Sequence, residues 1–355
     1  MKIPKLHIGN ITANIPIIQG GMGVRVSLSS LAAAVAEEGG IGTISSIGLG
    51  DIEASKNAYE KMSREALEIE IRKAKSMTDG HLAVNFMGVL SNVDDLILTA
   101  VREGIKIIVY GAGLPAKLPA LVDDDSVNLV PIVSSARVAE LILRTWDKRF
   151  ERVVDAFILE GPLAGGHLGF SKEQLDHVED YSLEILLPQI LETVKKYEDK
   201  YGKKIPVIAG GGIFTGKDIA RMLSLGASGV QMATRFVCTE ECGVSQEFKQ
   251  AYLDANEEDI TIIKSPVGMP GRAIHNKFLK DLEKKGKLDV KCPYRCLTAC
   301  KVTTARYCIA QALVNSYFGN LDQGLIFCGH NAYRVDKIVS VKDIIKELLD
   351  ELETV

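Results

Sequence analysis

Eight short apolar runs, rich in β-branched residues, recur along the chain, and each is followed by a stretch of helical periodicity. The runs are apolar on both faces, as expected for parallel strands that are buried on both sides. Eight such units within about 235 residues match the size of a (β/α)8 barrel. We therefore predict an α/β fold of the TIM-barrel type, with a doubly wound open sheet as the alternative. The predicted strands are 15–20, 40–46, 82–86, 105–111, 129–135, 156–161, 205–213 and 228–236.

Amphipathic stretches of helix length lie between these strands. The stretch 27–40 begins with serines, which we expect to cap a helix, and ends with glycines that stop it. The stretches 92–104, 135–149 and 215–227 repeat this form. The closing stretch 340–353 is amphipathic and charged on one side, which indicates a surface or subunit-contact helix and is consistent with a homodimer.

Composition excludes several classes of function. A net charge of −4 gives no basic footprint for nucleic acid. No apolar run reaches the roughly 18 residues that a membrane span needs. The opening MKIPKLHIGN is not a signal peptide. We therefore expect a globular, cytoplasmic protein that acts on a small molecule, with no nucleic-acid or membrane partner.

Unusual loops begin where several predicted strands end, which is where TIM barrels build their active sites. After the seventh and eighth strands come AGGGIFTG (209–216) and MATRF (232–236). Glycines there let backbone N–H groups approach an anion, and these two loops often form a phosphate cradle in barrels. The alternative is that the glycines only permit tight turns. After the first strand, Met22 could flank a flat ring, and at the end of the third strand Asn85 could hydrogen-bond to the edge of that ring. The alternative is that Asn85 only caps a turn.

One histidine, His167, lies among small residues in EGPLAGGHLGF (160–170). Glycine neighbours give an imidazole poor support as a core residue, and they suit a place where the backbone passes close to a ligand. The alternative is a loop histidine without a role.

These motifs carry a resemblance. IPIIQGGMG, NFM, EG-x-x-AGGH-x-G, IPVIAGGGI and GV-x-x-AT-R-F occur in order over about residues 12–280, and a weaker match resumes at 319–338. The combination resembles the flavin-dependent family of nitronate monooxygenases (2-nitropropane dioxygenases) and flavin-type enoyl-ACP reductase II. Two positions depart from the family pattern: Ala233 replaces a common glycine and Leu163 a frequent acid.

The resemblance implies a barrel that binds FMN, with His167 as the catalytic residue. We divide the chain into an FMN-binding barrel at 1–240, a helical or irregular Cys-rich segment covering the active site at 241–330, and a C-terminal helix at 331–355. The residues that the resemblance implies at the flavin are Gly21, Met22, Asn85, Glu160, Gly165, Gly166, Gly211, Gly212, Gln231, Met232, Ala233 and Thr234.

The first function that the resemblance implies is oxidation of alkyl nitronates by dioxygen. The alternative is NAD(P)H-dependent reduction of an enoyl thioester, with NAD(P)H or an acyl carrier as partner, and Glu160 and QGGM look closer to that branch. A flavin-free phosphate-binding barrel and a binding protein without turnover are weaker alternatives. No lysine stands at an obvious strand end for the Schiff base that some phosphate-binding barrels use.

Four of the seven cysteines, Cys292, Cys296, Cys300 and Cys308, fall within one short segment outside the family pattern. Four thiolates could bind an iron–sulfur cluster or zinc, although the spacing matches neither common motif. The alternative is a helix whose cysteines pack against the barrel. If the segment were one continuous helix, Cys292 and Cys300 would be about 12 Å apart and could not share an ion. A further cysteine, Cys328, is expected to return towards the flavin.

Overall fold

The chain is described by a computed structural model that covers residues 2–298 and 300–355. Eight parallel strands close into a barrel in the order β10-β11-β3-β4-β5-β6-β7-β8. The predicted (β/α)8 barrel is confirmed and the open sheet is wrong. The sheet closes because β11, the eighth barrel strand, pairs with β3, the first, while β10 pairs with β8. The barrel strands are β3 (Ile17–Gln19), β4 (Ile41–Ser45), β5 (His81–Met87), β6 (Ile107–Gly111), β7 (Asn128–Val133), β8 (Phe157–Glu160), β10 (Val207–Gly210) and β11 (Gly229–Met232).

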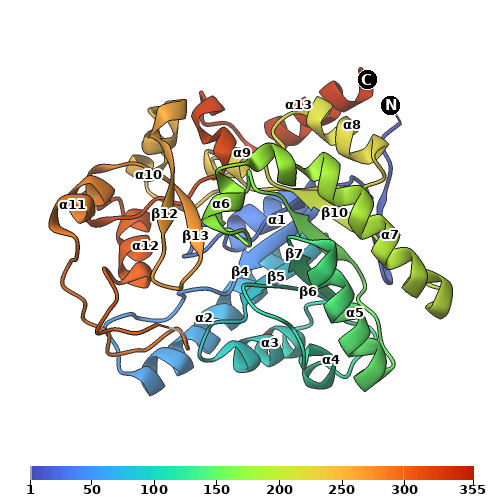
Figure 1. Ribbon diagram of the computed structural model, residues 1–355, viewed down its shortest axis with the longest axis horizontal. Coiled ribbons are helices and arrows are strands. Elements are labelled where there is room, and N and C mark those ends of the chain that lie inside the picture. Colours follow the sequence, from blue (N-terminus) through green and yellow to red (C-terminus); the bar gives the residue numbers. More distant parts are fainter. Residues whose placement is uncertain (1, 299) are drawn as a thin grey trace.

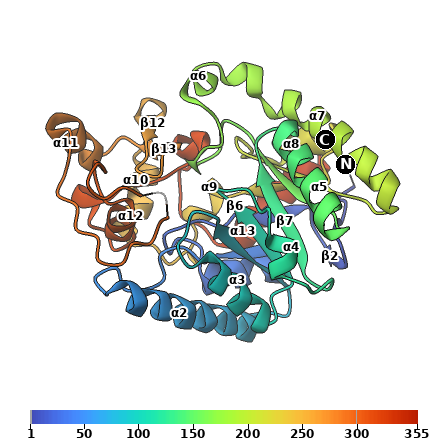
Figure 2. The same ribbon diagram turned by 60° about the horizontal axis from the view of Figure 1, so that its bottom comes forward.

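Helices surround the barrel (Figures 1 and 2). They are α1 (Ser29–Glu37), α2 (Lys56–Met77), α3 (Val93–Arg102), α4 (Leu118–Leu121), α5 (Ala136–Phe150), α6 (Lys172–Leu175), α7 (Leu183–Tyr201) and α8 (Gly216–Ser224). Thr215 caps α8 in a capping box, as its sequence suggests. The expected serine cap of α1 is wrong: its N-cap is Leu28, and Glu70 on α2 accepts from the backbone N–H of Ser29 at 2.8 Å.

The last helix, α13 (Val341–Glu353), packs on α8 and α1 and buries one side there (Figure 1). It thereby occupies the place of the helix that follows the eighth strand. Between β11 and α13 the chain makes a long excursion, residues 238–340, which we call the insert. Its elements after α9 (Thr234–Val237) are α10 (Gln246–Leu253), β12 (Ile260–Lys264), β13 (Pro270–Ile274), α11 (Lys277–Lys285), α12 (Ile309–Tyr317) and the short 3-10 helices at 257–259, 321–323 and 330–334.

The insert is joined to the barrel by a three-stranded antiparallel sheet. The central strand β13 pairs with β12 on one side and with β9 (Gly166–His167) on the other. In this register His167 lies opposite Gly271. The loop after the sixth barrel strand is therefore held by the insert, which appears as the orange lobe in Figure 1.

The core has two layers. One lies between strands and helices, and the other fills the barrel interior with inward-facing residues such as Ile18, Val109 and Ile208. The hairpin of β1 (Leu6–Ile8) and β2 (Ile11–Ala13) closes the N-terminal end, because Leu6 and Ile8 belong to the interior cluster. No helix in the described ranges is long and apolar enough to span a bilayer.

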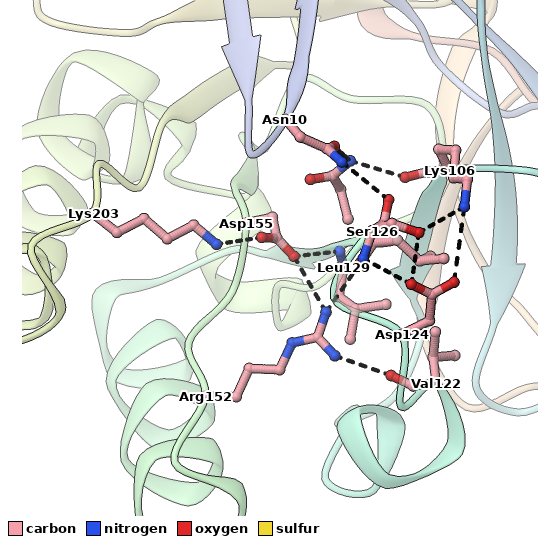
Figure 3. A network of polar contacts seen from close by, with 11 residues as sticks. Asn10, Lys106, Val122, Asp124, Ser126, Leu129, Arg152, Asp155 and Lys203 are labelled. Carbon is pink, nitrogen blue, oxygen red and sulfur yellow. Dashed lines mark hydrogen bonds and ion pairs between the residues drawn. The ribbon is translucent and has the colours of Figure 1, made fainter.

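Polar contacts fix the hairpin and the loops at this closed end (Figure 3). Asn10 at the hairpin tip accepts from Asn128 Nδ2 at 2.9 Å. The carboxylate of Asp155 is 4% exposed, forms an ion pair with Lys203, and accepts from the backbone N–H of Leu129 at 2.8 Å. Because these contacts close the N-terminal end of the barrel, the opposite end is where a site can form.

Candidate active site

A cavity of about 460 Å³ opens at the C-terminal ends of the barrel strands. We call it the central cavity. The C-terminal ends of all eight strands, or the loops that follow them, contribute to its wall. The insert covers the cavity with residues such as Met269, Phe327 and Cys328. Every residue that the sequence singles out for the flavin or for catalysis lines this cavity: Gly21, Met22, Asn85, Glu160, Gly165, Gly166, His167, Gly211, Gly212, Gln231, Met232, Ala233 and Thr234.

The ends of β10 and β11 form one end of the cavity. Gly211 and Gly212 have φ angles of +98° and +81°, which favour glycine. In the described ranges the backbone N–H groups of Gly212, Ile213 and Thr234 donate to no protein acceptor. Asn331 of the insert donates to the carbonyl of Gly212 at 2.8 Å and so supports the loop. The loops therefore present free backbone donors where an anionic group would lie.

Close backbone contacts shape the rest of the wall. A Cβ on Gly21 would lie 2.3 Å from Cβ of Asn85, so the first loop packs directly on this side chain. A Cβ on Gly165 would lie 2.6 Å from the backbone of Cys328. The AGGH loop thus touches the returning chain, and Cys328 lines the cavity. Burial raises the pKa of the Cys328 thiol to about 12, which keeps it protonated near neutral pH.

His167 projects into the cavity from β9. Its Nε2 shares a hydrogen bond of 2.7 Å with the hydroxyl of Ser265, and its ring meets the edge of Phe327 at a centroid distance of 5.0 Å. Desolvation lowers the pKa of His167 to about 4. The imidazole is therefore neutral near pH 7, and it can accept a proton or donate a hydrogen bond without carrying charge.

Glu160 at the end of β8 is the second titratable group in the wall. Desolvation raises its pKa to about 8, and the positive charge of Arg272 opposes that shift. Arg272 is 4% exposed and donates to the carbonyls of Pro162 (2.8 Å) and Ala164. Desolvation also lowers the pKa of this guanidinium, to about 10. Near pH 7 the cavity therefore holds a neutral acid, a neutral imidazole and, behind the AGGH loop, a cation.

Three residues of this arrangement escaped the sequence analysis: Ser265, Arg272 and Phe327. All lie on the insert: Ser265 begins the turn between β12 and β13, and Arg272 lies within β13. The signal available was the segment KSPVGMPGRAI, a proline- and glycine-rich turn between two short apolar runs, which is typical of a hairpin. That pattern predicts the hairpin but does not say what it faces.

Metal ligation at the cysteine segment is not preformed. Within residues 2–298 and 300–355, no three His, Cys, Asp or Glu side chains surround a common point as metal ligands would. The four cysteines are free thiols.

The fold and the cavity define a TIM-barrel protein whose strand-end loops and insert enclose a ligand site. The chain matches the pattern of the nitronate monooxygenase family over residues 5–351. It therefore belongs to this family of oxidoreductases, which confirms the resemblance seen in its motifs.

Individual relatives agree with this placement. A 5-hydroxy-7a-methyl-1-oxo-octahydro-indene-4-carboxyl-CoA dehydrogenase of Rhodococcus jostii is 29% identical over 77% of this chain. The match spans 66% of that relative's length, slightly under two thirds. A probable nitronate monooxygenase of Staphylococcus saprophyticus is 25% identical, over 79% of this chain and 81% of its own.

Solved structures extend the comparison. FabK from Thermotoga maritima has a TM-score of 0.74 and 27% identity, covering 96% of this chain and 94% of its own. Nitroalkane oxidase from Streptomyces ansochromogenes has the same TM-score, 0.74, at 21% identity, with 96% of each chain covered, and shows the shared fold alone.

Proposed function

We propose that this chain is an FMN-dependent oxidoreductase. The observation that carries the proposal is the convergence in one cavity of free backbone donors at one end and a neutral histidine in the wall. Gly211, Gly212 and Thr234 would hold the phosphate, and Met22 and Asn85 would flank the ring. Membership in the nitronate monooxygenase family supports the same cofactor.

The residues present fit this cofactor on structural grounds. The free N–H groups at Gly212, Ile213 and Thr234 suit a phosphate, since a buried donor without a partner is costly. The glycine-lined wall at residues 20–23 lets a planar ring lie against backbone. Bound FMN supplies a ring that accepts or delivers electrons, and the protein orients the substrate and excludes water.

His167 is the residue that we assign to catalysis. Toward a neutral nitroalkane the imidazole would remove the proton next to the nitro group. Toward a nitronate, which has already lost that proton, the imidazole donates a hydrogen bond to the charged oxygen. Ser265 is a positioning residue, because its hydroxyl bonds Nε2 and limits the orientations of the ring. Phe327 restricts the ring from the other side by an edge contact.

As substrate we propose an alkyl nitronate that is oxidised with dioxygen. A nitronate is a small anion, and near pH 7 the cavity wall carries no competing negative charge, because Glu160 is protonated below a pKa of about 8. The cation of Arg272 behind the AGGH loop favours an anion further.

A second candidate is NAD(P)H-dependent reduction of an enoyl thioester. The observation that favours it is the likeness to a relative named for a carboxyl-CoA compound, together with FabK at 27% identity over nearly the whole chain. In this candidate, NAD(P)H and an acyl carrier or coenzyme A thioester are the partners, and the protonated Glu160 is an acid within the cavity.

One pair of assays separates the candidates. Purified protein is expected to be yellow, and FMN is expected to be released intact on denaturation. Oxygen uptake is then measured with propyl-2-nitronate, and NADH and NADPH oxidation with and without crotonyl-CoA. Oxygen uptake without NAD(P)H turnover supports the nitronate reaction, and the reverse supports the thioester. A colourless protein that takes up no FMN would overturn both.

A further inference from the structure

The cysteine loop, residues 287–308, carries four thiols that the proposed reaction does not use. Its described residues form no helix or strand, so the helical spacing that would separate Cys292 from Cys300 does not apply. The chain turns at Arg295, which has a left-handed φ of +45°. Two contacts then hold the segment against the loop after β5. Leu297 forms an isolated antiparallel β-bridge with Leu90, and the carbonyl of Cys296 accepts from the backbone N–H of Ser91 at 3.0 Å.

The turn gathers three of the thiols around one buried ring. Tyr294 is 1% exposed, and its hydroxyl lies 2.8 Å from Sγ of Cys308. Cys292, Cys296 and Cys308 belong to the same small cluster of packed side chains as Tyr294. Residues far apart along the segment thus lie side by side, and none of the four thiols is consumed in a disulfide.

Electrostatics indicates that the fourth thiol is close as well. Burial raises the pKa of Cys296, and the neighbouring thiols of Cys308, Cys292 and Cys300 raise it further. Burial likewise raises the pKa of Cys300, with Cys292 and Cys308 adding to the effect. Cys300 therefore lies in the neighbourhood of the three thiols that pack around Tyr294.

The surroundings suit a centre of net negative charge. A metal held by four thiolates is anionic overall. Cys308 is the N-cap of α12, whose first turn carries partial positive charge, and its side chain makes no capping hydrogen bond. Between residues 287 and 308 there is one acid, Asp289, against the basic residues Lys287, Lys291, Arg295, Lys301 and Arg306.

The loop also adjoins the central cavity. Val24, Ile47 and Leu313 pack with the cysteine cluster and line the cavity at the same time. One layer of apolar side chains therefore separates the two places. A redox-active centre in the loop would lie beside the wall of the proposed flavin site.

We propose that Cys292, Cys296, Cys300 and Cys308 bind a metal centre through four thiolates, either an iron–sulfur cluster or a single zinc ion. In the described part of the chain the sulfurs are not yet arranged as ligands, so the irregular loop closes around the metal as it binds. On binding, each Cys S–H bond breaks, its proton passes to solvent, and a sulfur–metal bond forms without change in the oxidation state of sulfur.

The test is metal analysis of full-length protein purified without oxygen. We expect about one zinc, or about four irons with as many acid-labile sulfides, per chain. Iron with sulfide identifies the cluster, and zinc alone identifies the single ion. Both metals below about 0.2 equivalents, with the four thiols of the loop freely titratable by a thiol reagent, would overturn the proposal.

A variant pair assigns the metal to the loop. Cys296→Ala is compared with Cys238→Ala, which removes a buried free thiol outside the loop. We expect the first to lose at least about tenfold in bound metal and the second to keep it. Metal retained by a folded Cys296→Ala would refute the assignment. Should this variant fail to fold, the wild-type protein is alkylated before and after treatment with a chelator. If the loop binds the metal, its thiols become labelled only after the chelator has removed the metal. Neither readout depends on flavin or turnover.

Discussion

The two titratable groups of the central cavity predict a pH window for activity. Desolvation places the pKa of His167 at about 4 and that of Glu160 at about 8. Above the first value the imidazole is neutral, and below the second the carboxyl is neutral. Between them neither group is charged, so kcat/KM for a nitronate is expected to be flat from about pH 5 to pH 7.

The alkaline limb gives the sharper test. Ionisation of Glu160 places a negative charge in the wall beside an anionic substrate, and one pH unit above a pKa of about 8 only about a tenth of the sites remain neutral. Activity at pH 9 should therefore fall about tenfold. Glu160→Gln keeps the shape of the side chain and removes the ionisation, so this variant should lose that limb and remain flat to about pH 9.

The assay is oxygen uptake with preformed nitronate over about pH 5 to pH 10, analysed as kcat/KM. Glu179→Gln is the matched control, because the side chain of Glu179 is exposed and does not line the central cavity. Flavin fluorescence after each run reports whether cofactor was lost. An alkaline limb that persists unchanged in Glu160→Gln would refute the reasoning, since another group would then be titrating.

Three further predictions concern single residues. His167→Ala should reduce turnover by roughly 10²–10³-fold in the same assay while FMN stays bound, because one hydrogen-bond donor to the nitronate oxygen is lost; unchanged turnover would contradict its role. Gly212→Ala should weaken FMN binding by about tenfold in fluorescence titrations, because a non-glycine residue at a φ of +81° costs about 1–2 kcal/mol. Gly202→Ala, at the left-handed C-terminal end of α7, is the control and should leave FMN binding unchanged. Asp155→Ala should lower the free energy of unfolding by about 2–4 kcal/mol in denaturant titrations, because it leaves buried partners unpaired; a loss no larger than that of the exposed Asp79→Ala would contradict this.

The barrel could be predicted because each of its strands is a continuous apolar run. Burial on both faces leaves no alternation of polar and apolar residues, and each of the eight predicted runs overlaps an observed strand. The β1–β2 hairpin was missed because each of its strands has only three residues. The position of α13 against α8 was also missed, because an amphipathic pattern says that one face is covered and does not say by what. The cytoplasmic location and the homodimer stay predictions.

The barrel half of the cavity followed from topology. In a parallel barrel every strand ends at the same mouth, so loops 160–170, 209–216 and 232–236 had to lie together. The AGGH and GGI motifs then marked which residues line the space. Their exact roles toward a cofactor stay proposals, because a motif gives the position of a residue and not the group it touches.

The insert half could not be found in this way, and His167 shows why. Its partner Ser265 is 98 residues away, beyond two barrel strands, on a hairpin whose pairing with β9 depends on tertiary contact. The register that puts His167 opposite Gly271 is what brings the Ser265 hydroxyl within 2.7 Å of Nε2. The orientation of the imidazole is thus set jointly by a barrel loop and the insert. The chemistry of the histidine therefore belongs to neither part alone, and substitution of Ser265 should change its reactivity although this residue lies outside the barrel.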